Sequence, residues 1–154
     1  DLQRNTSETI SVRTLIGHEG FRVNLENIIE SASKQKNREI YIIGGAKDTD
    51  FYDATDGWYP QYISLSEKKK IKKRLLAPAS YSSEFKKKFA SEKNTELRTL
   101  SKGLSSPTYT RITKEMVSIE IYKPHLTIIQ IKNPTVAQAY LDSFNILWET
   151  SGKY

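Results

Sequence analysis

A short apolar run closed by two glycines, Glu39-Ile-Tyr-Ile-Ile-Gly44-Gly45, is the feature that most constrains how this chain can fold. The run is rich in β-branched side chains and lacks the polar alternation of a strand with one face in water. It therefore predicts a strand buried on both faces, which is typical of a parallel sheet covered by helices. A second strand of this type is predicted at Lys72–Ala77, because Pro78 cannot continue a central strand.

The pattern along the chain changes character near its middle. The first part alternates predicted strands, ending at 16, 44 and 77, with predicted helices at about 19–33, 58–70 and 83–90. Residues 48–57 are predicted to form a polar loop. Four predicted strands then follow in close succession, at 97–100, 108–112, 116–122 and 127–131, before a closing helix that Asn133 caps and Pro134 begins.

This order predicts an α/β fold with a mixed sheet, in which a parallel core is extended by antiparallel hairpins and closed by a C-terminal helix. In the strand at 116–122, Val117, Ile119 and Ile121 alternate with polar neighbours, as is typical of a half-buried antiparallel strand. The length of 154 residues suits one domain. We expect residues 10–154 to form that domain, after a polar lead-in at residues 1–9.

Composition excludes several classes of function. With no cysteine and two histidines, the chain has no disulfide framework, no thiolate metal site and no cysteine nucleophile. We therefore expect neither a metal nor a cofactor. No stretch is apolar enough to span a membrane and no signal-peptide pattern opens the chain, so we expect a cytoplasmic protein with no membrane partner.

The net charge of +6 is concentrated in one region. Residues 65–93 hold ten of the 24 basic residues and three of the 18 acidic ones. A basic cluster of this kind can attract nucleic acid, but a solvated face of two lysine-rich helices would give the same pattern. Both interpretations stay open, and the candidate nucleic-acid contacts are Lys69, Lys70, Lys73, Arg74 and Lys87.

Several segments, in order, carry a resemblance to a known family. They are Ser11–Phe21, Glu39–Gly45, Tyr59–Tyr62, Arg74–Pro78, Glu96–Leu100, Ser106–Ile112, Ile128–Asn133 and Val136–Trp148. Together they resemble the C-terminal effector domain of TrmB-type transcription regulators, which are common in archaea. The resemblance implies a phospholipase D-like fold and a sensory or dimerisation role in transcription regulation. It also implies a small effector, a homodimer, and DNA contact made mainly through an attached winged-helix domain that this chain does not include.

The same resemblance allows a test for catalysis. Active phospholipase D-type enzymes use an HxKxxxxD motif, in which the histidine attacks phosphorus and the lysine stabilises the phosphate charge. Neither His18 nor His125 has a lysine two positions further on. We therefore expect a domain that is not an enzyme, with a divergent phosphodiesterase kept as an alternative.

Ligands of open α/β sheets bind beyond the carboxyl ends of the strands, which places Gly44, Gly45 and Lys47 at one lip of a candidate site. If residues 108–112 occupy the place of the degenerate catalytic strand, Tyr109 and Arg111 share a face there. A guanidinium suits phosphate or carboxylate, and a tyrosine can stack on a sugar or a base. The alternative interpretation is that both are surface residues of an edge strand.

Overall fold

The computed structural model describes residues 9–100 and 107–153, which form one mixed sheet flanked by helices. The sheet has eight strands in the order β1-β7-β6-β5-β2-β3-β4-β8. Strands β2, β3 and β4 are parallel, and the other pairs are antiparallel, so the predicted mixed sheet is confirmed, although β4 (predicted at 97–100 among the antiparallel strands) joins the parallel core. Their bounds are β1 (Ser11–Ile16), β2 (Glu39–Gly44), β3 (Lys72–Pro78), β4 (Thr95–Leu100), β5 (Thr108–Ile112), β6 (Met116–Ile121), β7 (Thr127–Lys132) and β8 (Gly152–Lys153).

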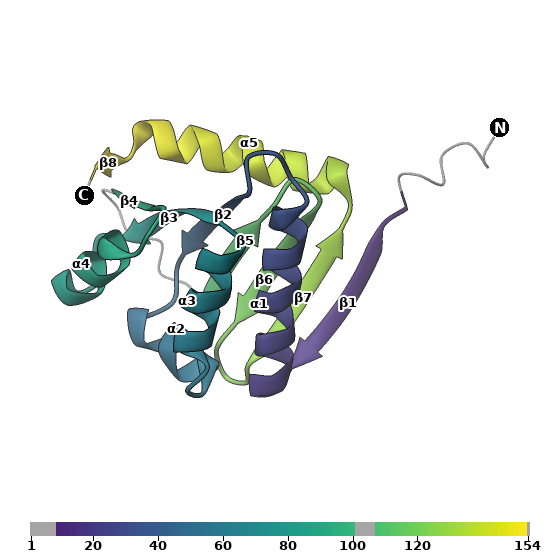
Figure 1. Cartoon of the computed structure of the whole chain (residues 1–154), viewed down its shortest axis with the longest axis horizontal. Helices are drawn as coiled ribbons and strands as arrows, with labels where there is room; N and C mark the ends of the chain where they lie inside the picture. Colours follow the sequence, from purple (N-terminus) through teal and green to yellow (C-terminus); the bar gives the residue numbers. More distant parts are fainter. Residues whose placement is uncertain (1–8, 101–106, 154) are drawn as a thin grey trace.

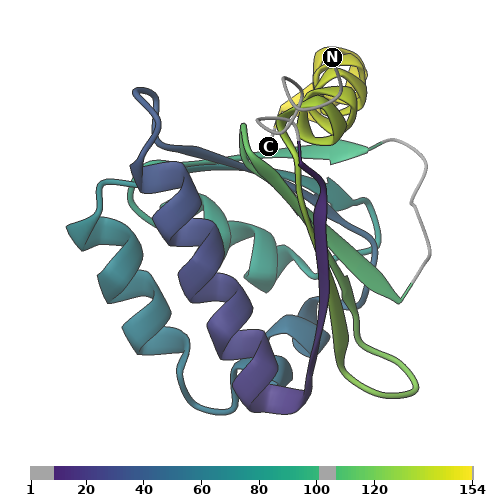
Figure 2. The same cartoon turned by 90° about the vertical axis from the view of Figure 1, so that its right-hand side faces the viewer.

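The helices divide unequally between the two faces of the sheet. Four of them lie on one face (Figure 1), namely α1 (Gly17–Ser33), α2 (Asp48–Thr55), α3 (Tyr59–Lys68) and α4 (Ser83–Ser91). Of the described helices, the closing helix α5 (Pro134–Thr150) is the one on the other face, where it lies along one end of the strands (Figure 2). None of the described helices has the length and apolar character that crossing a membrane requires.

Each face of the sheet has its own apolar core. On the four-helix face, Phe21 and Leu25 of α1 pack with the buried side chains Ile42 and Leu75 of the parallel strands. On the α5 face, Phe144 and Trp148 stack with ring centroids 5.5 Å apart. The central strand β2 contributes side chains to both cores, which explains why its sequence is apolar without alternation.

The structure corrects the sequence analysis at two elements of the first half. Residues 48–55, predicted as a polar loop, form helix α2, because Phe51 and Ala54 are buried in the core and stabilise a helix that is too short to form alone. Strand β1 opens the chain but does not pair with β2. It lies at the far edge of the sheet, antiparallel to β7.

A third difference concerns which face of β6 is inward. The isoleucines Ile119 and Ile121 are half-buried, whereas Ser118 and Glu120 are fully buried against the four-helix face. The alternation of this strand is therefore real, but its polar side is the more deeply buried one.

The α5 core generates a stability prediction. Replacing the fully buried Phe144 with alanine should lower the free energy of unfolding by about 3–5 kcal/mol, because a large cavity opens under α5. The neighbouring exposed Asn145→Ala should change it by less than about 0.5 kcal/mol. Urea denaturation of both variants checks this, and equal losses would contradict the assignment of Phe144 to the core.

Candidate functional site

A buried ion pair lies where α1 crosses the antiparallel strands on the four-helix face. Arg111 of β5 donates from Nε to Oε2 of Glu120 of β6 at 2.5 Å, and the two residues are 2% and 0% exposed. Glu120 also accepts a hydrogen bond from the Tyr122 hydroxyl at 2.7 Å. Burial works against a charged guanidinium and lowers the pKa of Arg111, but the Glu120 carboxylate, together with Tyr62 and Tyr122, raises that pKa above its usual value overall. Burial and Glu120 also raise the pKa of Tyr122.

Asn24 of α1 joins this pair to the neighbouring strands. Its Nδ2 donates to Glu120 at 2.9 Å, and its Oδ1 accepts from Ser118 and from Gln130, both at 2.7 Å. Asn24 is fully buried, so the amide satisfies polar groups that would otherwise be costly in the interior. The sheet and α1 are therefore joined at this point by hydrogen bonds in addition to apolar packing.

Helix α2 covers the ion pair with an aromatic ring. Phe51 lies with its ring centroid 4.8 Å from the Arg111 guanidinium and stacks on Tyr109 at 6.1 Å. The Tyr109 hydroxyl accepts a hydrogen bond from Tyr81 at 2.6 Å. A side chain at Gly44 would come within 2.8 Å of the Tyr81 hydroxyl, so the glycine allows this close approach.

A small internal cavity remains beside the guanidinium. It has a volume of about 10 Å³, enough for one water molecule. Arg111 is one of the residues that line this cavity, and its Nη2 has no hydrogen-bond partner among the described residues. The rest of the wall is mainly aromatic and aliphatic, with contributions from Ile42, Phe51, Tyr59, Tyr62, Leu75, Phe85, Phe89, Glu92 and Tyr109.

A second ion pair, between Lys73 and Glu92, adjoins this cavity, because Glu92 is one of the residues that line it. Lys73 is 2% exposed, and its Nζ lies 3.8 Å from Glu92 and 5.0 Å from the centre of the Tyr62 ring. The Tyr59 hydroxyl donates a hydrogen bond to the Glu92 carboxylate, with its two oxygens at 2.8 and 2.9 Å. Burial, and then the charge of Glu92, raise the pKa of Tyr59 well above its usual value.

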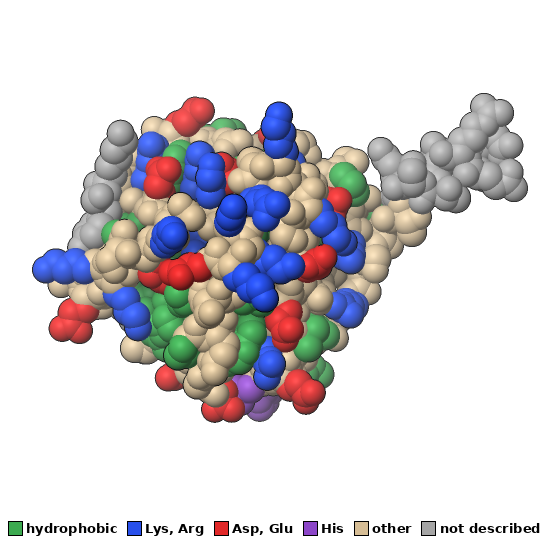
Figure 3. All heavy atoms as spheres, viewed as in Figure 1, with side chains coloured by type: hydrophobic (Ala, Val, Ile, Leu, Met, Phe, Trp, Pro, Cys, Tyr) green, Lys and Arg blue, Asp and Glu red, His purple; other side chains and the backbone are tan. Residues whose placement is uncertain are grey.

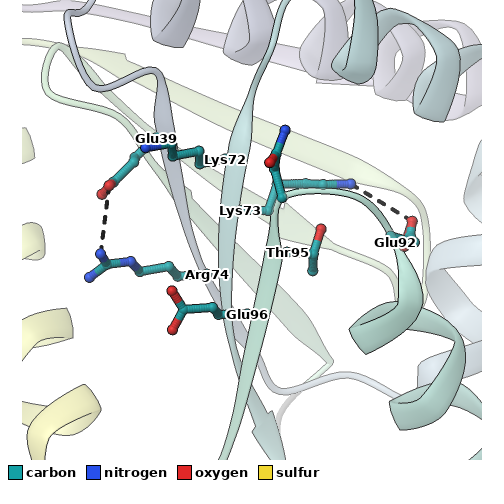
Figure 4. Close-up of a pocket in the computed structure, with 8 residues that line it drawn as sticks. Glu39, Lys72, Lys73, Arg74, Glu92, Thr95 and Glu96 are labelled. Carbon is teal, nitrogen blue, oxygen red and sulfur yellow. Dashed lines mark ion pairs between the residues drawn. The ribbon is translucent and has the colours of Figure 1, made fainter.

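An open pocket of about 340 Å³ lies outside this pair, at the amino ends of β2, β3 and β4. Figure 4 shows its charged side chains, with Arg74 facing Glu39 at 3.6 Å and Lys73 facing Glu92. The bases and acids that line it are equal in number, so its walls carry no net charge and do not form an anion site. They are Lys72, Lys73, Arg74, Glu39, Glu92 and Glu96.

The structure brings together some of the predicted ligand residues. Tyr109 and Arg111 lie side by side, as expected from their shared face, but both are sealed inside the domain. Gly44 touches the same cluster through Tyr81. The Gly45 amide is bonded to the Thr108 carbonyl at 3.0 Å, and Lys47 is exposed at the start of α2.

The predicted nucleic-acid residues do not form one surface. Lys70 and Lys87 are exposed and Lys69 is half-buried. Arg74 is paired with Glu39, and Lys73 lies in the interior. Neither histidine approaches the ion pair. The His18 ring is 3.1 Å from the Ala54 carbonyl, and His125 is exposed in a hairpin.

Sequence reasoning missed three residues of the site: Asn24, Phe51 and Glu120. The signal for Asn24 was a polar residue inside the apolar stripe of α1. Phe51 lies between aspartates in the sequence, and these aspartates favoured the prediction of a loop. Among the described residues, no group of three His, Asp or Glu side chains could hold a metal ion.

Comparisons with solved structures show the fold. NucT from Helicobacter pylori has a TM-score of 0.65 and 9% identity, over 95% of this chain and 100% of its own. Nuc from Salmonella typhimurium, a phospholipase D family member, has a TM-score of 0.64 and 15% identity, over 95% and 99%. The predicted phospholipase D-like fold is therefore confirmed.

TrmBL2, an archaeal chromatin protein whose structure shows a novel mode of DNA binding, has a TM-score of 0.59 and 20% identity. The match covers 93% of this chain and 54% of TrmBL2, so the chain spans about half the length of that protein. The fold is thus similar both to phospholipase D-type proteins and to a TrmB-type protein. No family model and no curated protein matches the sequence.

The buried ion pair generates a second stability prediction. Arg111→Met should lower the free energy of unfolding by about 3–5 kcal/mol, because it leaves the Glu120 carboxylate charged and without its ionic partner. The double variant Arg111→Met/Glu120→Gln should lose less, since no unpaired charge remains. Urea denaturation at pH 7 measures both. A double variant less stable than Arg111→Met would contradict the prediction, because the loss of stability would then not come from an unpaired charge on Glu120.

Proposed function

We propose that this chain is a non-catalytic, effector-sensing domain of a cytoplasmic DNA-associated regulator, joined in the full protein to a winged-helix domain that makes the main DNA contacts. The observation that carries the proposal is the buried Arg111, which lines an aromatic cavity and whose Nη2 has no hydrogen-bond partner among the described residues. Tyr109 and Arg111 have the same spacing as the histidine and lysine of an HxKxxxxD motif. A tyrosine is a poor substitute for that nucleophile, but the pair retains the ability to donate hydrogen bonds.

The charges around the cavity indicate what kind of effector it would accept. Arg111 is paired with Glu120, and Glu92 with Lys73, so the cavity has no net charge to offer. A charged ligand would be buried without a counterion, which is unfavourable. A small neutral molecule with hydroxyl groups, such as a sugar or a polyol, can accept from Nη2 and pack against the aromatic rings.

Binding would require Phe51 to move, because a cavity of about 10 Å³ holds no more than a water molecule. Phe51 lies on the eight-residue helix α2, which short loops join to β2 and α3. A short helix held by packing can shift as a unit. The effector would then replace the ring over Arg111 and change the position of α2.

Ligand binding is tested by a thermal-shift screen of neutral sugars and polyols, with nucleotides and phosphate as charged comparators. We expect a neutral ligand to raise the melting temperature, because it binds the folded state. Phe51→Ala should bind that ligand at least about tenfold more tightly, since the ring no longer has to be displaced. Phe144→Ala is the matched control, because it removes the same side chain from the opposite face of the sheet.

Two outcomes would contradict the proposal. One is a tighter-binding Phe144→Ala variant, because the cavity would then not be the site. The other is hydrolysis of bis(p-nitrophenyl) phosphate that is abolished in Arg111→Met, because the domain would then be a divergent phosphodiesterase.

A second candidate function, nucleic-acid binding, is favoured by a surface that the fold assembles from two segments. Arg38 donates from Nη1 to the Lys69 carbonyl at 2.8 Å, and the Lys72 amide donates to the Arg38 carbonyl at 2.8 Å. These bonds place the exit of α1 beside the lysine run that follows α3. We call the result the basic surface, which comprises Lys34, Lys36, Arg38, Lys68, Lys69, Lys70 and Lys72. Figure 3 shows basic side chains gathered over the upper part of the side of the molecule that it displays.

Fluorescence anisotropy with a labelled duplex across 20–200 mM salt tests this function. Binding should weaken steeply with salt, and Lys68→Ala/Lys72→Ala should weaken it and reduce the salt slope by up to about two, one for each phosphate that a lysine no longer neutralises. Lys87→Ala/Lys93→Ala makes the same change of charge on other exposed positions. Equal effects of the two double variants would mean that binding depends on net charge alone and not on the basic surface. Absence of binding at 20 mM salt would reject nucleic-acid binding altogether.

A further inference from the structure

We infer that the open pocket at the amino ends of β2, β3 and β4 binds a small zwitterion, a molecule such as an α-amino acid that carries one ammonium and one carboxylate group. The pocket has a volume of about 340 Å³, at the lower end of the range for small-molecule sites. The ligand would bind there and not in the aromatic cavity, so the inference does not rest on the proposed effector.

The strand register shows how the charged side chains of this pocket are placed. Side chains alternate along β3, so Lys72 and Arg74 lie on the α5 face of the sheet and Lys73 on the four-helix face. The cross-strand partner of Lys72 is Glu39, and that of Arg74 is Glu96, so both acids share the α5 face. Figure 4 shows Glu39, Arg74 and Glu96 on one side of the strands. We call Glu39, Lys72, Arg74 and Glu96 the charged platform.

Acids and bases alternate across the charged platform. Strand β2 contributes one acid, β3 two bases and β4 one acid, so each base has an acid beside it on a neighbouring strand. A simple anion placed there would meet two acids, and a simple cation would meet two bases. A zwitterion finds a partner for each of its charges and leaves the charge balance of the pocket unchanged.

Arg74 is held in place but keeps donors for a ligand. Its Nη2 lies 3.6 Å from Oε1 of Glu39, and its guanidinium lies 5.8 Å from the centre of the Trp148 ring of α5. Glu39 also accepts a hydrogen bond from the Tyr41 hydroxyl, which fixes the carboxylate. The contact with Glu39 is longer than a hydrogen bond, and the Arg74 side chain is 35% exposed. Its N–H groups can therefore donate to a ligand carboxylate.

Lys72 and Glu96 are the two exposed charges of the platform. Within residues 9–100 and 107–153, neither of them belongs to an ion pair. The backbone of Lys72 is fixed, because its amide donates to the Arg38 carbonyl at 2.8 Å. A ligand carboxylate would accept from Lys72 and Arg74, while the ligand ammonium would donate to Glu96.

The backbone around the pocket is already in place before a ligand binds. Asn94 has a left-handed φ of 58° and turns the chain from α4 into β4. The Lys73 amide donates to the Asn94 carbonyl at 2.9 Å, which joins this turn to β3. A site on paired strands and a bonded turn loses little entropy on binding, which favours a small ligand that has few contacts.

Exposure sets the affinity and the selectivity that we expect. Ion pairs with exposed side chains contribute little each, so we expect a dissociation constant in about the millimolar range. The pocket is open, and the side chain of an amino acid can extend from it into solvent. We therefore expect little discrimination among amino acids and strong discrimination against molecules that lack one of the two charges.

A titration of the ¹⁵N-labelled chain with L-alanine, followed by ¹H–¹⁵N correlation spectra at pH 6.5 and constant ionic strength, tests the inference. L-Alanine up to about 50 mM should give saturable shifts of the amides of residues 72–74 and 94–96. N-Acetyl-L-alanine lacks the ammonium and L-alaninamide lacks the carboxylate. Each should bind at least about tenfold more weakly, because one charge-assisted hydrogen bond is lost.

Two changes at Glu96 test the assignment of the charges. Glu96→Gln should weaken L-alanine binding at least about tenfold, because the ammonium loses its partner. Glu96→Lys should reverse the preference, so that N-acetyl-L-alanine binds more tightly than L-alanine, because the platform then carries three bases and one acid. Glu19→Gln is the matched control, since Glu19 is exposed in the first turn of α1 and does not line the pocket.

The same spectra show whether each variant is folded, and Glu96→Gln alone suffices should Glu96→Lys fail to fold. The absence of saturable shifts with L-alanine would overturn the inference. Equal binding of N-acetyl-L-alanine or of L-alaninamide would also overturn it, because one charge of the ligand would then go unrecognised. So would unchanged L-alanine binding in the folded Glu96→Gln variant. A melting shift with neutral polyols concerns the aromatic cavity alone, so the two proposals can fail separately.

Discussion

The ion pair between Arg111 and Glu120 is the interaction on which the rest of this structure depends. Charges in an interior are tolerated when they are paired and fully hydrogen-bonded, so the residues around them are strongly constrained. Asn24 must come from α1 to bind the carboxylate, and Ser118 and Gln130 must face α1 to bind the amide. The pair therefore fixes both the position of α1 and the inward face of three strands.

The same constraint determines the opposite face of the sheet. Side chains alternate along a strand, so placing Glu120 and Gln130 inward sends Ile119, Ile121 and Ile129 to the other side. Helix α5 covers the row nearest to its own axis through Phe144 and Leu141. An apolar surface on the outside is thus the direct consequence of a polar centre on the inside.

The sequence predicted the structure correctly where a local pattern is compatible with only one structure. The run at Glu39–Gly44 is apolar on both sides, and it could only be a strand with a core on each face. The alternation in β6 had two outcomes, because a period of two does not say which side is inward. That choice depends on Asn24, which is 96 residues away from Glu120 in the sequence. The shared face of Tyr109 and Arg111 followed from spacing, whereas their burial depends on Phe51 of a helix that only tertiary packing stabilises.

Strand β5, which lies between β2 and β6, contributes side chains to both faces of the sheet. Arg111 lines the aromatic cavity, and its neighbour Thr110 lies on the opposite face of the sheet, so one peptide unit separates the two faces. A change in the position of Arg111 when a ligand displaces Phe51 would be carried through a packed sheet that deforms little. The basic surface lies elsewhere, where the α1 exit meets the start of β3, so strand β2 separates it from β5.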